Sequence, residues 1–435
     1  MVNNEYLENM KEYLGDEYDS YFSLLNKEPF QGLRINTLKV DKDSYLKDNS
    51  LQQTKFSNNS FYCDKELGDG YKDEYMLREI YYQEPSASLP VECMDIQKGS
   101  LVLDMCASPG SKTTQILEIL DNTGLLVANE VNSKRAQVLK ENVIRHGAIN
   151  CVVLNSDTET IANELEGFFD YVLVDAPCSG EGMMRKSEEA VKQWSPQLIE
   201  QCRIMQKKIL EDAYRCLKKD GVLVYSTCTF NEIENEFQIK EFLETHSDAK
   251  LVEIDKDEIR NSKLIGEYGY GKKVFPMDGG EGQFAAKIVK TDESINKVKE
   301  LNDHVLPKEA KEFIESQLVN EFTYYYAYQN KYYGGFRPFY DFGKCYVLLD
   351  QIYLGEMKKD IFIPSFQFFN TSALQYKNII QIDKPNLDKY LHGDTIELEC
   401  DKGWYCLEYK GMPIGGVKSD GKVLKNHFPK EYRRN

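Results

Sequence analysis

The chain has 435 residues, of which 41% are hydrophobic and 29% are charged, and this composition is typical of a globular protein with about two to four domains. No apolar run approaches the roughly 20 residues that cross a bilayer, and the first residues lack the basic and apolar regions of a signal peptide. We therefore expect a cytoplasmic protein without a membrane partner. A formal charge of −17 disfavours nucleic acid as a partner of the whole surface, because phosphate binding needs Lys and Arg.

The cysteines point to the same compartment. There are 11, an odd number, and no two have Cys-x-x-Cys spacing. Free thiols in a reducing compartment explain this pattern better than disulfides or a zinc site. We expect no metal.

The first 95 residues predict a small α+β module. The sequence favours a helix and three short strands separated by a polar loop. The helix is expected at 6–14, the strands at 32–40, 61–63 and 79–83, and the loop at 47–59.

Strand and helix patterns alternate from residue 96 to 290. The candidate strands are 101–105, 125–130, 151–154, 171–175 and 221–228, and the candidate helices are 111–121, 133–147, 197–219 and 231–245. Nearly continuous apolar strands that alternate with helices predict an α/β fold with a parallel sheet covered on both faces. A turn and a late strand are expected over 279–288.

The remaining chain changes character. Residues 291–305 are polar and predict a linker or a short exposed helix, which a helix over 308–321 and a Tyr-rich segment at 324–328 follow. Short alternating segments from 375 to 435 predict a small β-barrel. Residues 402–435 hold eight basic and three acidic residues, a local charge of +5, which suits either RNA binding or a solvated Lys-rich end.

A constrained turn joins the strand at 101–105 to the following helix. It reads DMCASPGSKT from Asp104 to Thr113. Gly110 permits close approach of backbone to a ligand, Pro109 stiffens the turn, and the helix start offers free N–H groups. A phosphate-binding P-loop is excluded because Met105 stands where its first Gly would be, and the Gly-x-Gly-x-x-Gly pattern is absent. We expect a cofactor loop, with a purely structural turn as the alternative.

Two further strand ends carry acids. Glu130 ends the second strand of this region, where a carboxylate can hold the hydroxyls of a ribose. Asp157 follows the third strand, in a position to meet an adenine amino group. Strand-end acids also serve as helix N-caps, so each residue alone supports either interpretation.

Two cysteines follow the last two parallel strands. Cys178 lies in DAPCSG at 175–180, and Cys228 lies in STC at 226–228. Because open α/β sheets bind ligands at the carboxyl ends of their strands, both thiols are expected at one edge of the sheet. A thiol there can act as a nucleophile, and a second thiol can serve a second step.

These ordered motifs resemble the Nop/Sun family of RNA cytosine-C5 methyltransferases. The resemblance extends over residues from about 30 to 290 and rests on the segments 34–38, 82–86, 104–113, 175–180 and 226–228, with Glu130 and Asp157 between them. One departure is Gln283, where many members have an aromatic residue or His.

The resemblance implies a Rossmann-like methyltransferase core that uses S-adenosylmethionine and modifies cytosine in RNA. In the family the thiol that corresponds to Cys228 attacks C6 of the base, and the thiol that corresponds to Cys178 assists breakdown of the adduct. Asp175 is expected to bond the N3 edge of cytosine. The residues expected to bind the cofactor are Cys106, Ala107, Ser108, Pro109, Gly110, Ser111, Lys112, Glu130, Asp157 and Asp175.

The C-terminal part resembles the ribosomal small-subunit methyltransferase F subgroup, whose members end in a PUA-like RNA-binding domain. Segments 411–415 and 424–430 carry this resemblance. It implies RNA as the partner, with small-subunit rRNA ahead of tRNA, and we expect a monomer. The domains are expected to be an N-terminal RNA-binding module at 1–95, a catalytic domain at 96–290, a linker and intermediate domain at 291–374, and a PUA-like domain at 375–435.

Two rival interpretations remain open at this stage. In DNA cytosine-C5 methyltransferases the Pro-Cys thiol is the nucleophile, which would promote Cys178 over Cys228. A non-catalytic ribosome-assembly factor could also retain the fold and bind RNA. The Ser-Thr-Cys motif at 226–228 and the PUA-like C-terminal part speak against the DNA methyltransferase. The two thiols together with the complete cofactor loop speak against the assembly factor.

Overall fold

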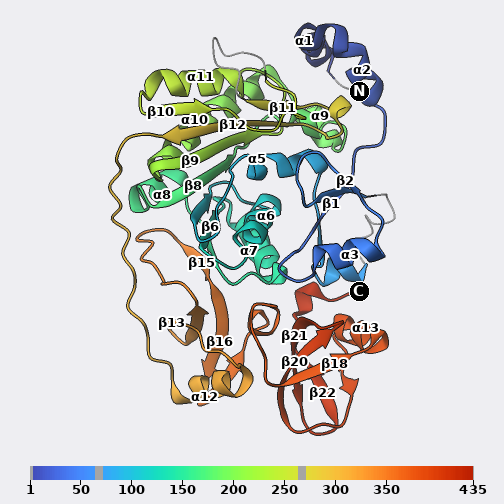
Figure 1. Ribbon diagram of the computed structural model, residues 1–435, viewed down its shortest axis with the longest axis vertical. Helices are drawn as coiled ribbons and strands as arrows, with labels where there is room; N and C mark the ends of the chain where they lie inside the picture. The colour runs from blue at the N-terminus through green and yellow to red at the C-terminus, as the bar shows by residue number, and fades with distance from the viewer. Residues whose placement is uncertain (1–2, 64–71, 263–270, 435) are drawn as a thin grey trace.

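A nine-stranded mixed sheet organises the protein, whose computed structural model describes residues 3–63, 72–262 and 271–434 (Figure 1). The strands run in the order β10-β12-β9-β8-β5-β6-β7-β15, and β11 pairs with β12. Neighbours from β9 to β7 are parallel, whereas β10, β11, β12 and β15 pair antiparallel. The bounds are β5 Leu101–Asp104, β6 Leu125–Asn129, β7 Cys151–Leu154, β8 Phe169–Asp175, β9 Leu217–Thr227, β10 Ala249–Val252, β11 Lys272–Val274, β12 Gln283–Lys290 and β15 Val347–Asp350.

Helices cover both faces of this sheet, as the apolar strands predict. Successive strand residues point to opposite faces, so Val102 packs with α5, α6 and α7 while Leu103 packs with α8, α10 and α11. The helices are α5 Leu89–Glu92, α6 Ser111–Leu120, α7 Ser133–His146, α8 Thr158–Glu164, α9 Glu188–Gln193, α10 Pro196–Arg215 and α11 Glu236–Thr245. Among the described residues, no helix combines the length and apolar character that a membrane span requires.

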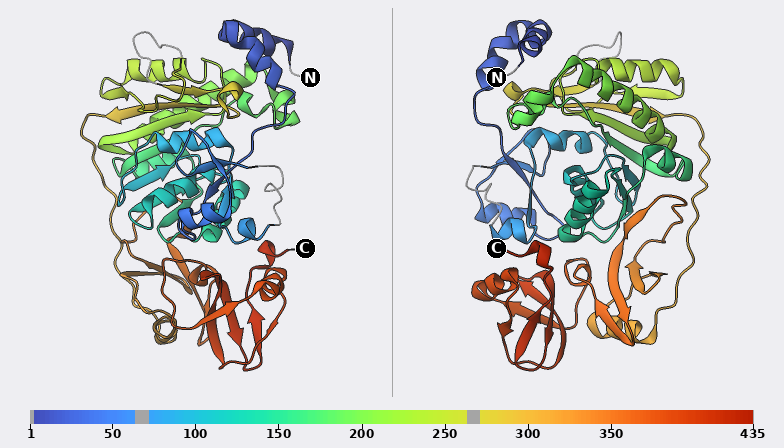
Figure 2. Two further views of the ribbon diagram at one scale, coloured as in Figure 1. Left: turned by 45° about the vertical axis from the view of Figure 1, so that its right-hand side comes forward. Right: turned by 180° about the vertical axis from the view of Figure 1, so that it is seen from behind.

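The N-terminal module flanks the sheet on one side (Figure 2). Its two N-terminal helices pack against Trp194, Phe230 and Phe275 of the catalytic region. Its four-stranded sheet has the order β2-β3-β1-β4. The elements are α1 Asn4–Leu14, α2 Tyr18–Leu24, β1 Gly32–Ile35, α3 Lys42–Asp48, β2 Gln52–Gln53, β3 Ser60–Tyr62, α4 Asp73–Met76 and β4 Ile80–Tyr82.

Two smaller sheets form the lower part of the molecule in Figure 1. One has the order β13-β14-β16-β17, and the other is a curled sheet with the order β18-β20-β21-β22-β19. The elements are α12 Lys308–Gln317, β13 Tyr324–Tyr328, β14 Lys331–Gly335, β16 Ile352–Lys358, β17 Ile361–Pro364, β18 Ile379–Ile382, α13 Lys384–His392, β19 Ile396–Glu397, β20 Gly403–Tyr409, β21 Met412–Ser419 and β22 Val423–Asn426. The end of the chain returns to the N-terminal module, where Asp73 forms 2.6 Å ion pairs with Arg434 and Lys384.

Strand β15 crosses a predicted domain limit. It belongs by sequence to the intermediate region but pairs with β7, with Val347 opposite Leu154 and Asp350 opposite Val152. The catalytic sheet thus includes a strand that lies after residue 290, the expected end of the catalytic domain. The domain limits themselves stay a prediction.

Several element boundaries differ from the sequence-based expectations. The strand predicted over 32–40 ends at Ile35, because the backbone of the next residues turns around Asn36. The polar stretch expected as a loop over 47–59 contains the end of α3 and the short strand β2. The helix predicted over 197–219 ends at Arg215, since Leu217 already pairs with Phe169 in the sheet.

Two further segments are loops, and one of them differs from the expectation. The helix predicted over 231–245 begins at Glu236, because residues before it form a hydrogen-bonded loop in which the Asn231 side chain accepts the Glu234 N–H. Residues 291–305 contain no helix and follow an extended path between the two parts of the molecule (Figure 1). The linker alternative is therefore the one observed.

Candidate active site

A cavity of about 850 Å³ opens at the carboxyl ends of the central parallel strands. Its lining residues come from the turns after β5, β6, β7, β8 and β9 and from α9 and α10. They include Cys106, Ser108, Glu130, Arg135, Asp157, Asp175, Cys178, Met183, Ile204, Met205 and Cys228. The volume lies in the range of small-molecule binding sites. The structure thus brings both thiols and the strand-end acids to one cavity.

The two thiols lie side by side. Strands β8 and β9 are adjacent and parallel, with Asp175 opposite Ser226, so the chain after each strand reaches the same place. The Sγ atoms of Cys178 and Cys228 are 3.3 Å apart, and either can donate its S–H to the other. Neither Cys178 nor Cys228 forms a disulfide.

A buried carboxylate fixes the loop that follows Cys228. Glu181 Oε2 accepts hydrogen bonds from the Phe230 and Asn231 N–H groups at 2.7 and 2.8 Å and from the Thr229 hydroxyl at 2.8 Å. Its Oε1 accepts the indole N–H of Trp194 at 3.0 Å. Glu181 comes from the loop after Cys178, so it couples the two thiol loops.

A second buried carboxylate, Glu234, fixes the loop that contains Cys178. Its Oε2 accepts the Ser179 N–H at 3.0 Å and the Gln206 side-chain amide at 2.8 Å, and its Oε1 accepts the Asn231 side-chain amide at 2.7 Å. Burial raises the pKa of Glu234, although these donors oppose the shift. Glu181 and Glu234 therefore fix the two loops that carry the thiols, through bonds to neighbouring residues.

A glycine is required at position 182, where the loop after Cys178 passes close to the backbone of Cys228. The Gly182 N–H donates to the Cys228 carbonyl at 2.9 Å. A Cβ atom at Gly182 would lie 2.9 Å from that oxygen and 3.1 Å from the Cα of Gly282. Any larger residue would displace the Cys228 backbone.

Asp175 lines the same cavity as the thiol pair, and its carboxylate accepts hydrogen bonds from three side chains. Lys112 Nζ forms an ion pair with its Oδ2 at 2.8 Å, and the Ser226 hydroxyl donates to its Oδ1 at 2.8 Å. The side-chain amide of Gln283 donates to the same Oδ1 at 3.4 Å. Gln283, the departure noted in the sequence, is thus a buried partner of Asp175.

The electrostatics distinguish the cysteines of the cavity. The hydrogen bond with Cys228 raises the pKa of Cys178 well above its usual value, and burial raises it further. Burial and the acids Asp104, Asp175 and Glu130 raise the pKa of Cys106. Cys178 and Cys106 therefore stay protonated at neutral pH.

Lys112 supplies the positive charge near the pair. Burial lowers the pKa of Lys112, but Asp175 and the negative charge of a Cys228 thiolate raise it, and the net shift is upward. The buried ammonium therefore stays charged and attracts negative charge at the Cys228 sulfur. No histidine is needed for this effect.

The acids at the cofactor end have local partners. Glu130 Oε1 accepts the Asn132 N–H at 2.8 Å, and its Oε2 lies 3.2 Å from the Arg135 guanidinium. Asp157 caps α8, where its two oxygens accept the N–H and hydroxyl of Thr160 at 2.9 and 2.8 Å. Both acids nevertheless line the cavity, so the cap and the binding interpretations coexist for Asp157.

The predicted cofactor loop contributes unevenly. Cys106 and Ser108 line the cavity, whereas Ala107, Pro109, Gly110, Ser111 and Lys112 are absent from its lining. Gly110 has a φ of +113°, and a Cβ atom there would lie 3.3 Å from the Leu139 side chain. Glycine is therefore required by the backbone turn and the packing of α7 rather than by the cavity wall.

Sequence reasoning missed the wall formed by α9 and α10. Ile204 and Met205 line the cavity and are 64% and 49% exposed, so they present apolar surface to whatever the cavity binds. Arg135 was missed as well. Ile204 and Met205 could not be recognised from the sequence, because single exposed apolar residues are common on the surface of amphipathic helices.

Three family models match this chain. The model described as 16S rRNA methyltransferase RsmB/F matches residues 91–289, the N-terminal domain of 16S rRNA methyltransferase RsmF matches residues 2–85, and the methyltransferase RsmF PUA domain matches residues 377–434.

Full-length relatives are similar over nearly the whole chain. Ribosomal RNA small subunit methyltransferase F of Vibrio vulnificus (strain YJ016) is 30% identical over 446 residues, which cover 96% of this chain and 94% of the relative. The protein of the same name from Aeromonas salmonicida (strain A449) is 29% identical, with 93% and 91% covered.

Solved structures resemble the catalytic part. A methyltransferase homolog protein from Pyrococcus horikoshii has a TM-score of 0.54 and 28% identity and covers 63% of this chain and 91% of its own. NSun6 from Pyrococcus horikoshii, crystallised with SFG, has a TM-score of 0.56 and 20% identity over 66% of this chain and 98% of its own, which supports the fold. The fold class predicted from the sequence is confirmed, with a methyltransferase core and a C-terminal PUA domain.

Proposed function

Because this chain belongs to the ribosomal RNA small subunit methyltransferase F family, we propose that it methylates C5 of a cytosine in small-subunit rRNA through a covalent bond to Cys228. The methyl donor of this family of enzymes is S-adenosylmethionine. The observation that carries the proposal is the 3.3 Å separation of the Cys178 and Cys228 sulfur atoms beside Asp175 in one cavity.

A thiolate solves the chemical difficulty of this reaction. C5 of cytosine is a poor nucleophile in the intact ring. When the Cys228 sulfur bonds to C6, electron density moves to C5 and N3, and C5 can then form a bond to an electrophilic methyl group. The bound cofactor supplies that methyl group. Loss of the C5 proton then restores the double bond and expels the Cys228 thiolate.

The proton on Cys178 supports the assignment of roles. While Cys228 is free, its hydrogen bond raises the pKa of Cys178, so Cys178 acts as a donor that stabilises negative charge on Cys228. Once the Cys228 sulfur is bonded to C6, this cause of the raised pKa disappears. Cys178 can then release its proton to solvent, and the resulting thiolate is placed to accept the C5 proton.

Asp175 and Lys112 also serve the base. Addition of sulfur to C6 places negative charge on the N3 side of the ring. We assign Asp175 to the N3 edge, where one proton is shared between its carboxyl group and N3, and the Lys112 ammonium that pairs with Asp175 brings a positive charge to the same side. Ser226 and Gln283 orient the Asp175 carboxylate through its other oxygen.

The cavity suits the cofactor at the end away from the thiols. Glu130 and Asp157 offer carboxylate oxygens to hydroxyl and amino groups, and Cys106 and Ser108 line the same cavity. The side chains of Ile204 and Met205 add apolar surface to the lining. The described residues therefore fit a nucleoside with an aliphatic chain that points toward Cys228.

The curled C-terminal sheet provides a basic surface for RNA. Lys418 and Lys425 lie directly opposite each other on β21 and β22, and Lys425 also pairs with Asp420 at 3.5 Å. Lys418 Nζ lies 5.7 Å from the centre of the Trp404 ring. We propose that this face contacts rRNA, while the cytoplasmic location and monomeric state expected from the sequence also remain proposals.

Substitution of the two cysteines tests the mechanism. The substrate is small ribosomal subunits from cells that lack the protein, with radiolabelled S-adenosylmethionine as the donor. Cys228→Ala should give no methylation and no covalent complex. Cys178→Ala should attack and then stall, which leaves an RNA–protein complex that survives denaturing electrophoresis. Cys400→Ala, outside the cavity, serves as the matched control and should behave as the wild type.

Three outcomes would contradict the proposal. A complex trapped by Cys228→Ala would assign the nucleophile to Cys178. Full activity of Cys228→Ala would remove the covalent step. Failure of the wild-type protein to methylate any RNA, together with normal S-adenosylmethionine binding, would support a non-catalytic assembly factor. Bisulfite sequencing of the product would identify the cytosine.

A further inference from the structure

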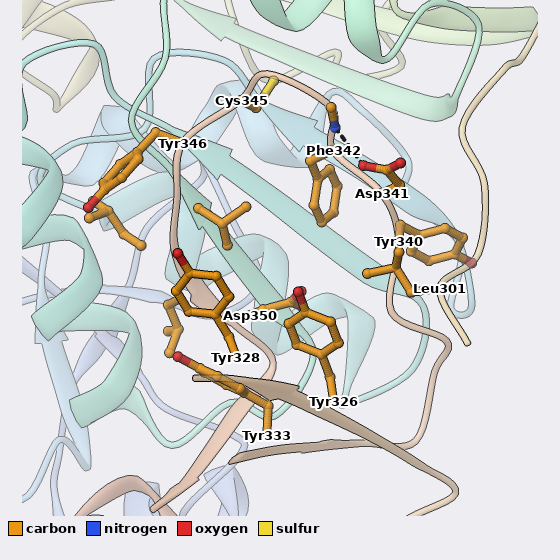
Figure 3. A pocket seen from close by; sticks show the side chains of 14 residues that line it. Leu301, Tyr326, Tyr328, Tyr333, Tyr340, Asp341, Phe342, Cys345, Tyr346 and Asp350 are labelled. Atoms are coloured by element: carbon orange, nitrogen blue, oxygen red, sulfur yellow. Dashed lines mark hydrogen bonds between the residues drawn. The ribbon is translucent and has the colours of Figure 1, made fainter. Parts of the chain in front are cut away.

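A second cavity is lined by residues of β13, β14 and β15, where β15 is the edge strand of the catalytic sheet. Its volume is about 510 Å³. Figure 3 shows its lining, in which the rings of Tyr326, Tyr328 and Tyr333 lie beside Asp350. The other lining residues include Asp341 and Tyr346.

The Tyr-rich segment divides its side chains between two tasks. In β13, Tyr325 and Ala327 point toward the core formed with Phe322 and Phe362. Tyr326 and Tyr328 point to the other face and line the cavity. Tyr333 lies directly opposite Tyr326 in β14 and joins them on that face, with 6.2 Å between the ring centres.

Asp350 lies at the end of β15 without a partner for its charge. It is 6% exposed, and its Oδ1 is buried with no hydrogen-bond partner. Within the described part of the chain, no ion pair includes Asp350. A buried carboxyl group without a partner is costly, and packing of aromatic rings does not require one.

The charge of the lining selects the ligand. The 14 lining residues include two carboxylates and no Lys, Arg or His. RNA phosphates would meet only negative charge there. Tyrosine faces attract cations, and a carboxylate beside them adds a direct ion pair.

We propose that this cavity binds an organic cation, an ammonium or guanidinium group on an aliphatic chain, with the charge held by Asp350 and enclosed by the rings of Tyr326 and Tyr333. The source can be a free polyamine or a Lys or Arg side chain of a ribosomal protein. The size of the cavity accommodates either, and Tyr328 and Tyr346, which are 57% and 64% exposed, form its rim.

The protonation of Asp350 gives the site a pH dependence. Burial raises the pKa of Asp350 to about 7. The titratable groups that face it are Tyr326, Tyr333 and Cys151, each with its pKa raised by burial and by the Asp350 charge, so they stay neutral below pH 8. A cation binds the ionised carboxylate, and binding should therefore be about tenfold weaker at pH 6 than at pH 8.

Isothermal titration calorimetry of the full chain with spermidine and, separately, with N-acetylarginine amide tests the proposal. Asp350→Asn should weaken binding by about 30-fold or more, because the buried charge pair is lost. Asp360→Asn makes the same change at an exposed turn outside the cavity and should leave affinity unchanged. Tighter binding of spermidine indicates a free polyamine, and tighter binding of the arginine derivative indicates a protein side chain.

Two results would overturn the assignment. One is absence of binding of both cations to the wild-type protein at millimolar concentration. The other is equal affinity of wild type and Asp350→Asn. Binding of cytidine or guanosine without binding of either cation would identify an RNA base site instead. If Asp350→Asn does not fold, the pH dependence of the wild type and the loss of binding in Tyr326→Leu decide the question.

Discussion

Replacement of Arg34 should destabilise the junction between the N-terminal module and helix α6. Arg34 is completely buried, and its guanidinium donates to Glu118 at 2.8 and 3.0 Å. It also donates to the Gln83 side chain at 2.6 Å, the Ser111 carbonyl at 2.8 Å and the Thr114 hydroxyl at 2.7 Å. Arg34→Met keeps an unbranched apolar stem, lacks the guanidinium group and removes all five hydrogen bonds.

The expected loss in the free energy of unfolding depends on the Glu118 carboxylate, which remains buried in the variant. Glu118 is also buried, so loss of Arg34 leaves a carboxylate with weaker partners, chiefly the Asn59 amide at 3.0 Å. Breaking a buried ion pair from one side costs about 3–5 kcal/mol. Arg34→Met with Glu118→Gln should lose clearly less than the sum of the two single changes, because the double variant leaves no buried charge.

The same pair predicts a pH dependence. Burial acts to raise the pKa of Glu118, but Arg34 and His146 more than offset this effect, so the folded-state pKa is lowered. The stabilisation is therefore present above the unfolded pKa of Glu, about 4.3, and is lost as pH falls through the folded value. The destabilisation by Arg34→Met should therefore be larger at pH 7 than near pH 3, which lies below the unfolded pKa of the Glu118 carboxyl group.

Urea denaturation monitored by Trp194 fluorescence, in a Trp404→Phe background, measures these free energies of unfolding. Trp194 is buried in the catalytic region, so it reports on the part that Arg34 joins. A loss below about 1 kcal/mol for Arg34→Met, or strict additivity in the double variant, would refute the reasoning.

The other predictions concern ligands. Glu130→Gln keeps the hydrogen bond from the Asn132 N–H but removes the charge that faces Arg135, and it should weaken S-adenosylmethionine binding by about tenfold in calorimetry, whereas unchanged affinity would remove Glu130 from the site. Lys418→Gln with Lys425→Gln should weaken binding of small-subunit rRNA and lower its salt slope by about two, measured by filter binding from 50 to 200 mM salt. An unchanged slope would exclude this face, and unchanged cofactor affinity is the control.

Much of the site could be predicted because local sequence fixes where parallel strands end. Strand β7 was predicted with its observed bounds, and β5 and β6 differ from the prediction by one residue at the end. Since carboxyl ends of parallel strands meet at one edge, the placement of Glu130, Cys178 and Cys228 around one cavity followed from their positions in the chain. Motif order then gave the family resemblance.

The remaining features depend on contacts between residues distant in the chain. The amide of Gln283 meets Asp175 only because β12 pairs antiparallel with β9. No local pattern states which strand will be a neighbour of which, because the energy of pairing comes from side chains and hydrogen bonds of both partners.

The sequence by itself determined the apolar periodicity, the strand ends and the residue types of the thiol and cofactor motifs. Only the tertiary structure decided that β15 leaves the intermediate region to pair with β7, which places Asp350 against the tyrosines of β13 and β14. From the sequence alone, an aspartate such as Asp350 at the end of a short apolar segment is expected in a turn or at the protein surface. Its burial without a partner arises because the sheet edge and a second sheet close over it together, and that closure is a property of the assembled fold.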